Sequence, residues 1–223
     1  MSRAFVTLSV LACAVALAAC RTEYHSYGER PVASEDAPVG ELNGRTVFFR
    51  VERVFYNNPP ECVVVLPAPD GGMAAAEIAH IERAVARHLR DKVPRVIGSL
   101  QRDQAVRRLA FDLNHAGDRR RFGQIENCDV FLRWRAIGSS SAYFLVWSGR
   151  DFGLDVELFR EPGQTLWKAS HVAHRSDGNL PLSPLSAPLA IFEAGRFSKD
   201  QDILPSMIDD IMRRLVVSLP DVR

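Results

Sequence analysis

The sequence predicts an α/β (α+β) fold, in which a strand–helix–strand–helix segment precedes an antiparallel meander and a C-terminal helix. Apolar residues recur every three or four positions in residues 73–92, 101–114 and 205–219, which is the period of an amphipathic helix. Between residues 129 and 174 they alternate with polar residues, which is typical of strands with one wetter face. We therefore expect one mixed sheet with helices packed on it.

Three short segments are expected to form the first strands. Residues 45–56 are rich in Val, Phe and Tyr and precede Asn57-Asn58-Pro59-Pro60, which interrupts the strand. Residues 62–66 form a continuous apolar run before Pro67, as in a strand buried on both faces. Residues 95–97 follow Pro94, which ends the first helix.

Two helices and a loop are expected between the second strand and the meander. The helix over residues 73–92 is expected to be amphipathic. Its apolar face contains Ile78, Ile81, Val85 and Leu89, and its charged face contains Glu82, Arg83, Arg87 and Arg90. The helix over residues 101–114 directs Val106, Leu109 and Leu113 inward. Residues 115–121, which include three consecutive arginines, read as a loop; the arginines form either a solvated face or a phosphate-binding patch.

The meander is expected to contain four strands separated by short turns. The predicted strands cover residues 129–135, 142–148, 152–159 and 165–174, and the turns contain Gly138–Ser141, Ser148–Asp151 and Pro162-Gly163. Residues 179–188 carry three prolines and read as a loop, and residues 189–197 as a short helix. In the last helix, proline is tolerated in the first turn.

The N-terminal residues predict export. A basic start, Met1-Ser2-Arg3, precedes an apolar run over residues 4–16, which is too short to span a bilayer, and Leu17-Ala18-Ala19-Cys20 follows. This pattern resembles the lipobox of bacterial lipoproteins, in which the cysteine is lipidated and becomes the first residue. The alternative is an ordinary signal peptide that happens to contain a cysteine.

The resemblance implies three regions and a location. Residues 1–19 are the signal peptide, residues 20–40 are the lipidated Cys20 with a disordered tether, and residues 41–223 are one domain. About 20 tether residues span roughly 25 Å, and at most about 65 Å when extended. Because Arg21 rather than aspartate follows Cys20, the resemblance to sorted lipoproteins points to the periplasmic face of the outer membrane.

The charge balance argues against one class of partner. The chain of 223 residues has 28 Lys and Arg and 27 Asp and Glu, and loss of the signal peptide removes one cation, Arg3. The mature chain is therefore balanced, and nothing in its charge favours nucleic acid or an anionic lipid surface.

Two cysteines remain once Cys13 has left with the signal and Cys20 has taken lipid. An exported chain folds where disulfides persist, so Cys62 and Cys128 are a candidate bridge; the alternative is two separately buried thiols. We expect their strands to be parallel neighbours, with Val64 opposite Val130 and Leu66 opposite Leu132.

Several segments together resemble a group of periplasmic lipoproteins. They are the Val63–Pro67 strand, Arg95–Ile97 before the second helix, the step from Phe122 to Leu132, and the hairpin from Leu158 to Trp167. These features are similar to proteins around the curli-secretion protein CsgG, to an uncharacterised lipoprotein family of the GNA type, and to the Pel-polysaccharide export lipoprotein PelC. The resemblance covers roughly residues 61–219 and implies the fold and a non-enzymatic role.

Residues suited to catalysis or metal binding do not form a recognisable motif. His80 and His88 are eight residues apart on one helix, and His171 and His174 point to opposite faces of one strand. Asp155 and Glu157 share a strand face and form either an acid–base pair or part of a solvated face. We therefore expect no catalytic residue, no metal and no cofactor apart from the lipid on Cys20.

A partner surface is expected on the first strand and in the meander, at Phe49, Val51, Phe55 and Trp147; of the three tryptophans, at least two are expected in the core. The leading hypothesis is an envelope lipoprotein that supports secretion, export or outer-membrane assembly, as a homo-oligomer or with other envelope proteins. The second is a regulatory module that activates an envelope enzyme, as LpoB-type proteins do. A small-molecule-binding protein is the third.

Overall fold

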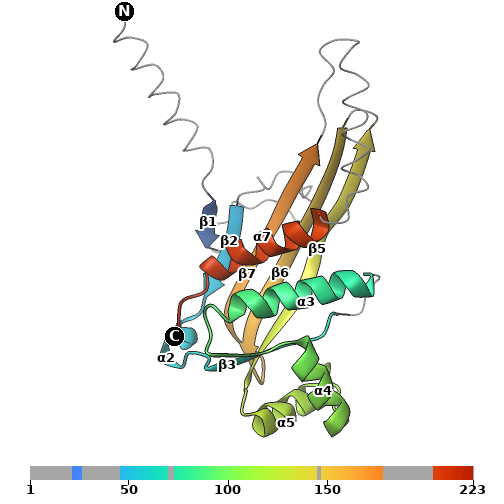
Figure 1. The fold of residues 1–223 in the computed structure, drawn as a ribbon. Helices are drawn as coiled ribbons and strands as arrows, with labels where there is room; N and C mark the ends of the chain where they lie inside the picture. The colour runs from blue at the N-terminus through green and yellow to red at the C-terminus, as the bar shows by residue number, and fades with distance from the viewer. Residues whose placement is uncertain (1–21, 27–45, 70–72, 145–146, 178–202, 223) are drawn as a thin grey trace, which may run out of the picture.

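The computed structural model describes residues 22–26, 46–69, 73–144, 147–177 and 203–222. Seven strands form one mixed sheet in the order β1-β2-β7-β6-β5-β3-β4 (Figure 1). The strands are β1 (Glu23–Ser26), β2 (Thr46–Val51), β3 (Cys62–Val65), β4 (Arg95–Ile97), β5 (Val130–Phe144), β6 (Trp147–Arg160) and β7 (Gln164–Asp177). The helices are α2 (Arg53–Asn57), α3 (Ala75–Leu89), α4 (Ser99–Leu109), α5 (Ala116–Glu126) and α7 (Ile203–Val217).

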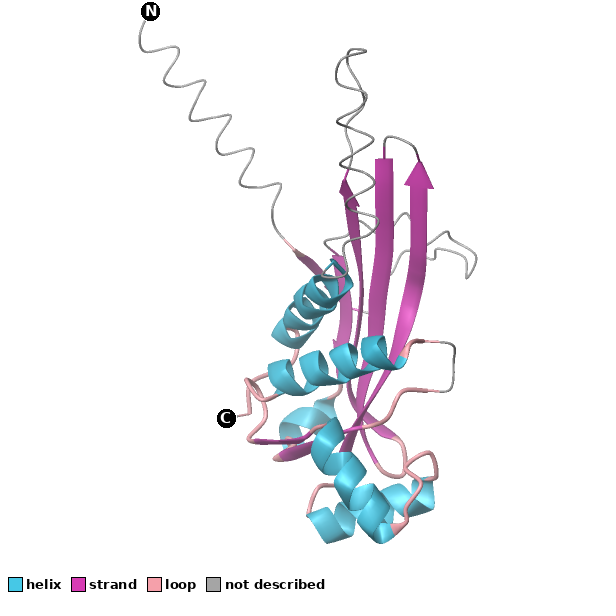
Figure 2. Cartoon of the chain, turned by 45° about the vertical axis from the view of Figure 1, so that its right-hand side comes forward, coloured by secondary structure: helices cyan, strands magenta, loops and turns pink. Residues whose placement is uncertain are grey.

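The predicted fold class is confirmed: β3, α3, β4 and α4 precede an antiparallel β5–β6–β7 meander and a C-terminal helix. Helices α3 and α7 lie side by side across the sheet (Figure 2). The core between these helices and the sheet contains fully buried side chains such as Ile81, Val85, Trp167 and Ile211. Burying one large apolar side chain stabilises the fold by about 1.5–3 kcal/mol, so this layer is the main source of stability.

A second, smaller core lies where α4 and α5 meet the sheet. It includes Val64, Ile97, Phe122, Phe131 and Phe159. Strand β3 lies between the two cores, which explains its continuous apolar run. Val63 and Val65 face the first core, Val64 faces the second, and all three are fully buried. Two of the tryptophans, Trp134 and Trp167, are buried as expected.

The prediction of one strand over residues 45–56 is wrong in its second half. The strand ends at Val51, and residues Arg53–Asn57 form the short helix α2. Alternation stops at this point, because Val54, Phe55 and Tyr56 are three consecutive apolar residues. One helical turn buries Phe55, which is 1% exposed, and leaves Tyr56 65% exposed.

The predicted loop over residues 115–121 is also wrong, because helix α5 begins at Ala116. Only Phe122 and Gly123 are buried on this helix, so its sequence carries little apolar periodicity. Gly123 allows a close approach: a Cβ at this position would lie 2.9 Å from the backbone oxygen of Cys128. Packing against the rest of the protein therefore stabilises this helix, which its own sequence pattern does not predict.

The meander contains three long strands instead of the four short ones predicted. Gly138–Ser141 and Ser148–Asp151, expected as turns, lie within β5 and β6. The register shifts between Ile137 and Ser140, so a β-bulge accommodates the Gly-Ser segment inside the strand. Pro162-Gly163 is a turn, as predicted.

Three smaller predictions also need correction. Residues 23–26, placed in the disordered tether, form β1 and pair in parallel with β2. Glu82, expected on the charged face of its helix, is 4% exposed. Helix α7 begins at Ile203 rather than at Pro205, which lies in its first turn. The short helix predicted over residues 189–197 lies outside the described residues.

Candidate functional site

The start of β1 and the tip of the β5–β6 hairpin belong to the same end of the sheet. Strand β1 runs parallel to β2, which is antiparallel to β7, so β1 begins at the end where β7 finishes. At that end Asp177 of β7 pairs with Ser148 of β6, next to the Phe144–Trp147 pair that closes the hairpin. The three long strands extend beyond the helices there, as Figure 1 shows.

The pairing registers give the height of the hairpin above β1. Glu23 pairs with Thr46, and the next residue of β2, Val47, pairs with His171 of β7. One residue further along β7, Val172 pairs with Gly153 of β6. From Gly153 to Trp147 the strand advances six residues, or about 20 Å at roughly 3.3 Å per residue. The hairpin therefore projects about 20 Å past the first residue of β1.

The four residues predicted to form a partner surface lie in different environments. Phe49 and Val51 are half-buried and pack against the core, and Phe49 also contacts the ring of Tyr24 on β1. Phe55 is 1% exposed, so assigning it to a surface is wrong: α2 turns it into the core. Trp147 is the first residue of β6, at the tip of the hairpin.

Cys62 and Cys128 are joined by a disulfide, with their Cα atoms 5.2 Å apart. The expected strand neighbours are correct, since β3 and β5 pair in parallel. The expected register is wrong by one residue, because Val63, not Val64, lies opposite Val130. Both cysteines belong to the second core, and they line a cleft of about 530 Å³ together with α5 and Arg160.

The sheet face opposite α3 carries a ladder of ion pairs. Arg133 donates to Glu157 at 2.9 Å, and Arg135 to Asp155 at 3.1 Å, across the β5–β6 pairing. The Arg133 guanidinium also lies 4.8 Å from the centre of the Phe159 ring. These side chains line an open cleft of about 410 Å³ with Leu66, Pro67 and Leu113.

The chemistry of this ladder does not suit an acid–base pair. Burial alone would raise the pKa of Glu157, but hydrogen bonds from Arg133 and Thr165 outweigh it and hold the pKa below its ordinary value. A general acid at neutral pH needs a raised pKa. Glu157 is therefore ionised at neutral pH and neutralises Arg133, as in the solvated-face interpretation.

The histidines pair with neighbouring groups. The Nε2 atom of His88 lies 2.6 Å from Oδ1 of Asp209, and His174 lies 2.5 Å from Asp151. His171 is buried, and its Nδ1 atom lies 2.7 Å from the carbonyl oxygen of Thr46. Within the described ranges, no three His, Cys, Asp or Glu side chains gather closely enough to hold a metal ion.

Strand β1 was not predicted from the sequence, and the predicted lipidation site is not part of the described residues. The docked strand β1 carries a short polar sequence, Glu-Tyr-His-Ser, whose only strand signal is one aromatic residue. Cys20 lies outside the described residues. None of the helices in the described ranges is long and apolar enough to cross a bilayer.

Known proteins offer only distant likenesses. No protein-family model matches the chain, and no curated protein matches it. Among solved structures, the PelC dodecamer from Paraburkholderia phytofirmans is 13% identical over 76% of this chain and 96% of its own, with a TM-score of 0.41. Lipoprotein GNA1162 from Neisseria meningitidis is 16% identical over 63% of this chain and 100% of its own, also with a TM-score of 0.41. At these values the likenesses carry no argument about function.

Proposed function

We propose that this protein is a lipid-anchored envelope protein, held at the periplasmic face of the outer membrane, that acts by binding and assembly rather than by catalysis. The observation that carries the proposal is the shared end of the sheet: β1, which follows Cys20 after only two residues, starts on the side to which the β5–β6 hairpin projects. An anchor on Cys20 would therefore hold the hairpin end toward the bilayer.

The lengths agree with this orientation. From Cys20 to Glu23 the chain reaches at most about 10 Å. The hairpin projects about 20 Å past Glu23, so its tip would meet the membrane interface before the rest of the domain. Tyr143, Phe144 and Trp147 stand at the tip, and Trp and Tyr favour the interface between lipid and water. In this orientation the connection from Cys20 to β1 is short, whereas the sequence suggested a tether of about 20 residues.

The test measures binding of the mature chain to phosphatidylethanolamine vesicles. Cys20→Ala should abolish fatty-acid labelling and most vesicle binding, because a lipid chain supplies most of the affinity. Trp147→Ser should leave labelling intact and weaken vesicle binding, measured by co-sedimentation with the vesicles. The matched control is Trp167→Phe, which removes a tryptophan from the core. An alanine variant that binds vesicles like the wild type would remove the basis of the proposal.

We also propose that the anchored copies assemble to support secretion, export or outer-membrane assembly. Confinement to a plane raises the local concentration of copies, and the balanced charge gives little repulsion between them. The sheet has two edge strands, β1 and β4, and neither exceeds four residues. Crosslinking in cells, followed by mass spectrometry, would identify the copies and other envelope proteins that assemble with it.

A second function, regulation of an envelope enzyme, is supported by the side chains exposed on α4 and α5, at the end of the molecule away from the hairpin. There Leu100 on α4 and Ile125 on α5 are 71% and 56% exposed. Arg107, Arg120 and Arg121 have no ion-pair partner within the part of the chain that the structure describes. Exposed apolar side chains among unpaired cations suit an acidic partner protein. A stable monomer in solution would favour this function over assembly.

A further inference from the structure

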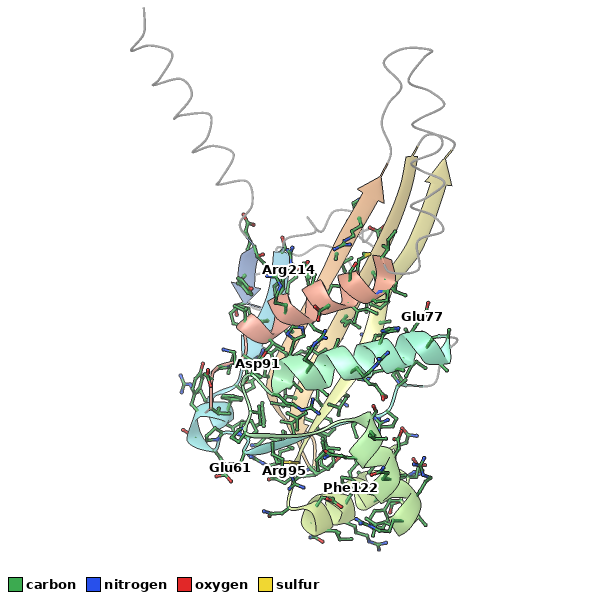
Figure 3. All side chains as sticks on the ribbon, viewed as in Figure 1. Glu61, Glu77, Asp91, Arg95, Phe122 and Arg214 are labelled. Atoms are coloured by element: carbon green, nitrogen blue, oxygen red, sulfur yellow. A yellow bond between two sulfur atoms is a disulfide. The ribbon has the colours of Figure 1, made fainter. Side chains whose placement is uncertain are left out.

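Strand β1 covers the outer edge of β2 through a small set of contacts. Four residue pairs form the parallel ladder, from Glu23 with Thr46 to Ser26 with Phe49. The Tyr24 ring packs edge-on against Phe49 at 6.1 Å, and its hydroxyl donates to the carbonyl oxygen of Arg214 at 3.2 Å. Arg214, labelled on α7 in Figure 3, donates in turn to the Thr22 hydroxyl at 3.4 Å. The acceptor surface is thus formed by β2 and α7.

These contacts hold β1 only weakly to the sheet. Glu23, Tyr24 and Ser26 are exposed, whereas Val47 and Phe48 of β2 are buried against the rest of the sheet. An element with few buried apolar contacts opens at a small fraction of the global unfolding free energy. Once β1 leaves, β2 remains paired with β7 but presents a row of unpaired backbone groups and the apolar Phe49 at an open edge.

The connection between the two strands is long enough for docking within one chain, where a crossover between parallel strands takes a dozen or more residues, and also for docking on another chain. To return from the end of β1 to the start of β2, the chain has to cover about four residues of strand, or roughly 13 Å. Residues 27–45 number 19, which reach roughly 65 Å when extended and typically span about 25 Å. This length allows β1 to reach the β2 edge of an adjacent copy.

We propose that the outer edge of β2, with Phe49 and Arg214, is a strand-acceptor surface that takes β1 of a second copy. The contacts are the same whether β1 comes from its own chain or from another, so only local concentration decides between the two. Membrane-anchored copies share one plane and one orientation, which brings their β2 edges to the same height. The inference rests on the assembly function proposed above and names the surface through which copies exchange a segment.

The experiment traps the exchanged strand with engineered cysteines in the mature, membrane-bound chain. One copy carries Glu23→Cys with a large tag, and the other carries Thr46→Cys with a small tag; these positions pair in the ladder. A disulfide between them in co-expressed copies can only form between chains. We expect a mixed dimer at least about ten-fold above that of the off-register pair Glu23→Cys with Arg50→Cys, whose partners lie about 13 Å apart along β2. Peptide mapping has to place the link between positions 23 and 46.

Two further variants make the outcome decisive. Tyr24→Ser in the first copy should lower the mixed dimer several-fold, and Tyr56→Ser, which alters an exposed tyrosine elsewhere, should not. A single chain carrying both cysteines reports docking within one copy. If that chain forms only the internal link while the mixed copies form no dimer, or if no link forms in either, the exchange is refuted. Detergent partitioning of the same samples reports the anchor separately, so failure of the anchor and failure of the exchange are distinguishable.

Discussion

At the scale of single residues, a buried ion pair connects three elements. Glu82 on α3 and Arg102 on α4 are each 4% exposed, and their side chains form two hydrogen bonds at 3.1 and 3.0 Å. Arg102 also donates to the carbonyl oxygen of Val65 on β3 at 2.9 Å. The Nε atom of Arg102 donates to Asp103 at 2.8 Å. Every guanidinium nitrogen and both Glu82 oxygens therefore have a hydrogen-bond partner, which is the condition under which a buried pair is tolerated.

We predict that Glu82→Ala lowers the free energy of unfolding by up to about 3–5 kcal/mol, because it leaves the Arg102 charge buried with Asp103 as its remaining acidic partner. The double variant Glu82→Leu with Arg102→Met should lose much less, since it removes both charges and keeps the volume. Urea unfolding followed by circular dichroism measures both. Equal losses in the single and double variants would contradict the explanation.

His171 predicts a pH dependence of stability. Burial holds the pKa of His171 below its ordinary 6.5; the Thr46 carbonyl and Asp210 oppose this effect, and Arg214 adds to it. The unfolded chain takes up a proton near pH 6.5 that the folded chain resists, so the free energy of unfolding should decrease as the pH falls below about 6.5. The decrease should stop once the pH is below the folded-state pKa.

Urea midpoints between pH 7.5 and 5 would measure this slope. His171→Phe should remove most of the slope, whereas His174→Gln, which alters an exposed histidine paired with Asp151, should retain it. A slope unchanged in His171→Phe would assign the pH dependence to another group.

At the scale of elements, α5 is held in place by close packing rather than by its own periodicity. We predict that Gly123→Ala costs about 1–3 kcal/mol, because its Cβ would meet a backbone oxygen at 2.9 Å. Gly117→Ala in the same helix, where a Cβ meets nothing within 4 Å, should stabilise by up to about 1 kcal/mol. Thermal unfolding of the two variants compares them directly, and a shared sign would refute the packing argument.

The disulfide ties the start of β3 to the residue that precedes β5. It closes a loop with a sequence separation of 66, so the chain-entropy account predicts a loss of up to about 4 kcal/mol in the Cys62→Ala, Cys128→Ala variant. Urea unfolding with and without reductant measures this loss: reductant should destabilise the wild type and leave the double variant unaffected. Titration of two free thiols in unfolded, unreduced wild type would show that the bridge does not form.

At the scale of the whole molecule, the edge strand β1 is the segment expected to control assembly. β2 lies inside the sheet between β1 and β7, and α2 buries Phe55, so deleting residues 41–58 should unfold the domain. Residues 22–26 are at the edge of the sheet. Deleting them should leave a folded domain that no longer exchanges strands.

We predict that the lipid-free chain over residues 21–223 forms oligomers at tens of micromolar, and that the chain without residues 22–26 is a monomer with an unchanged circular dichroism spectrum. Light scattering across this concentration range measures the mass of each. A mass equal to one chain for both would move support from assembly to the regulatory function.

The sequence by itself determined the order β3, α3, β4 and α4, the meander before a C-terminal helix, most of the apolar face of α3 and the buried β3. These features depend on local periodicity and on continuous apolar runs, which a linear pattern records directly. The signal-peptide pattern before Cys20 is likewise a sequence feature, and the anchor remains a prediction from it.

Only the tertiary structure decided the features that depend on distant neighbours. β1 forms because β2 and α7 provide its partners, and Glu82 is buried because Arg102 arrives from another helix to neutralise it. The Gly-Ser segment of β5 continues as a strand because β6 pairs with it on both sides of the bulge. In each case a long-range contact outweighs the local preference, and local preference is all that a single sequence displays.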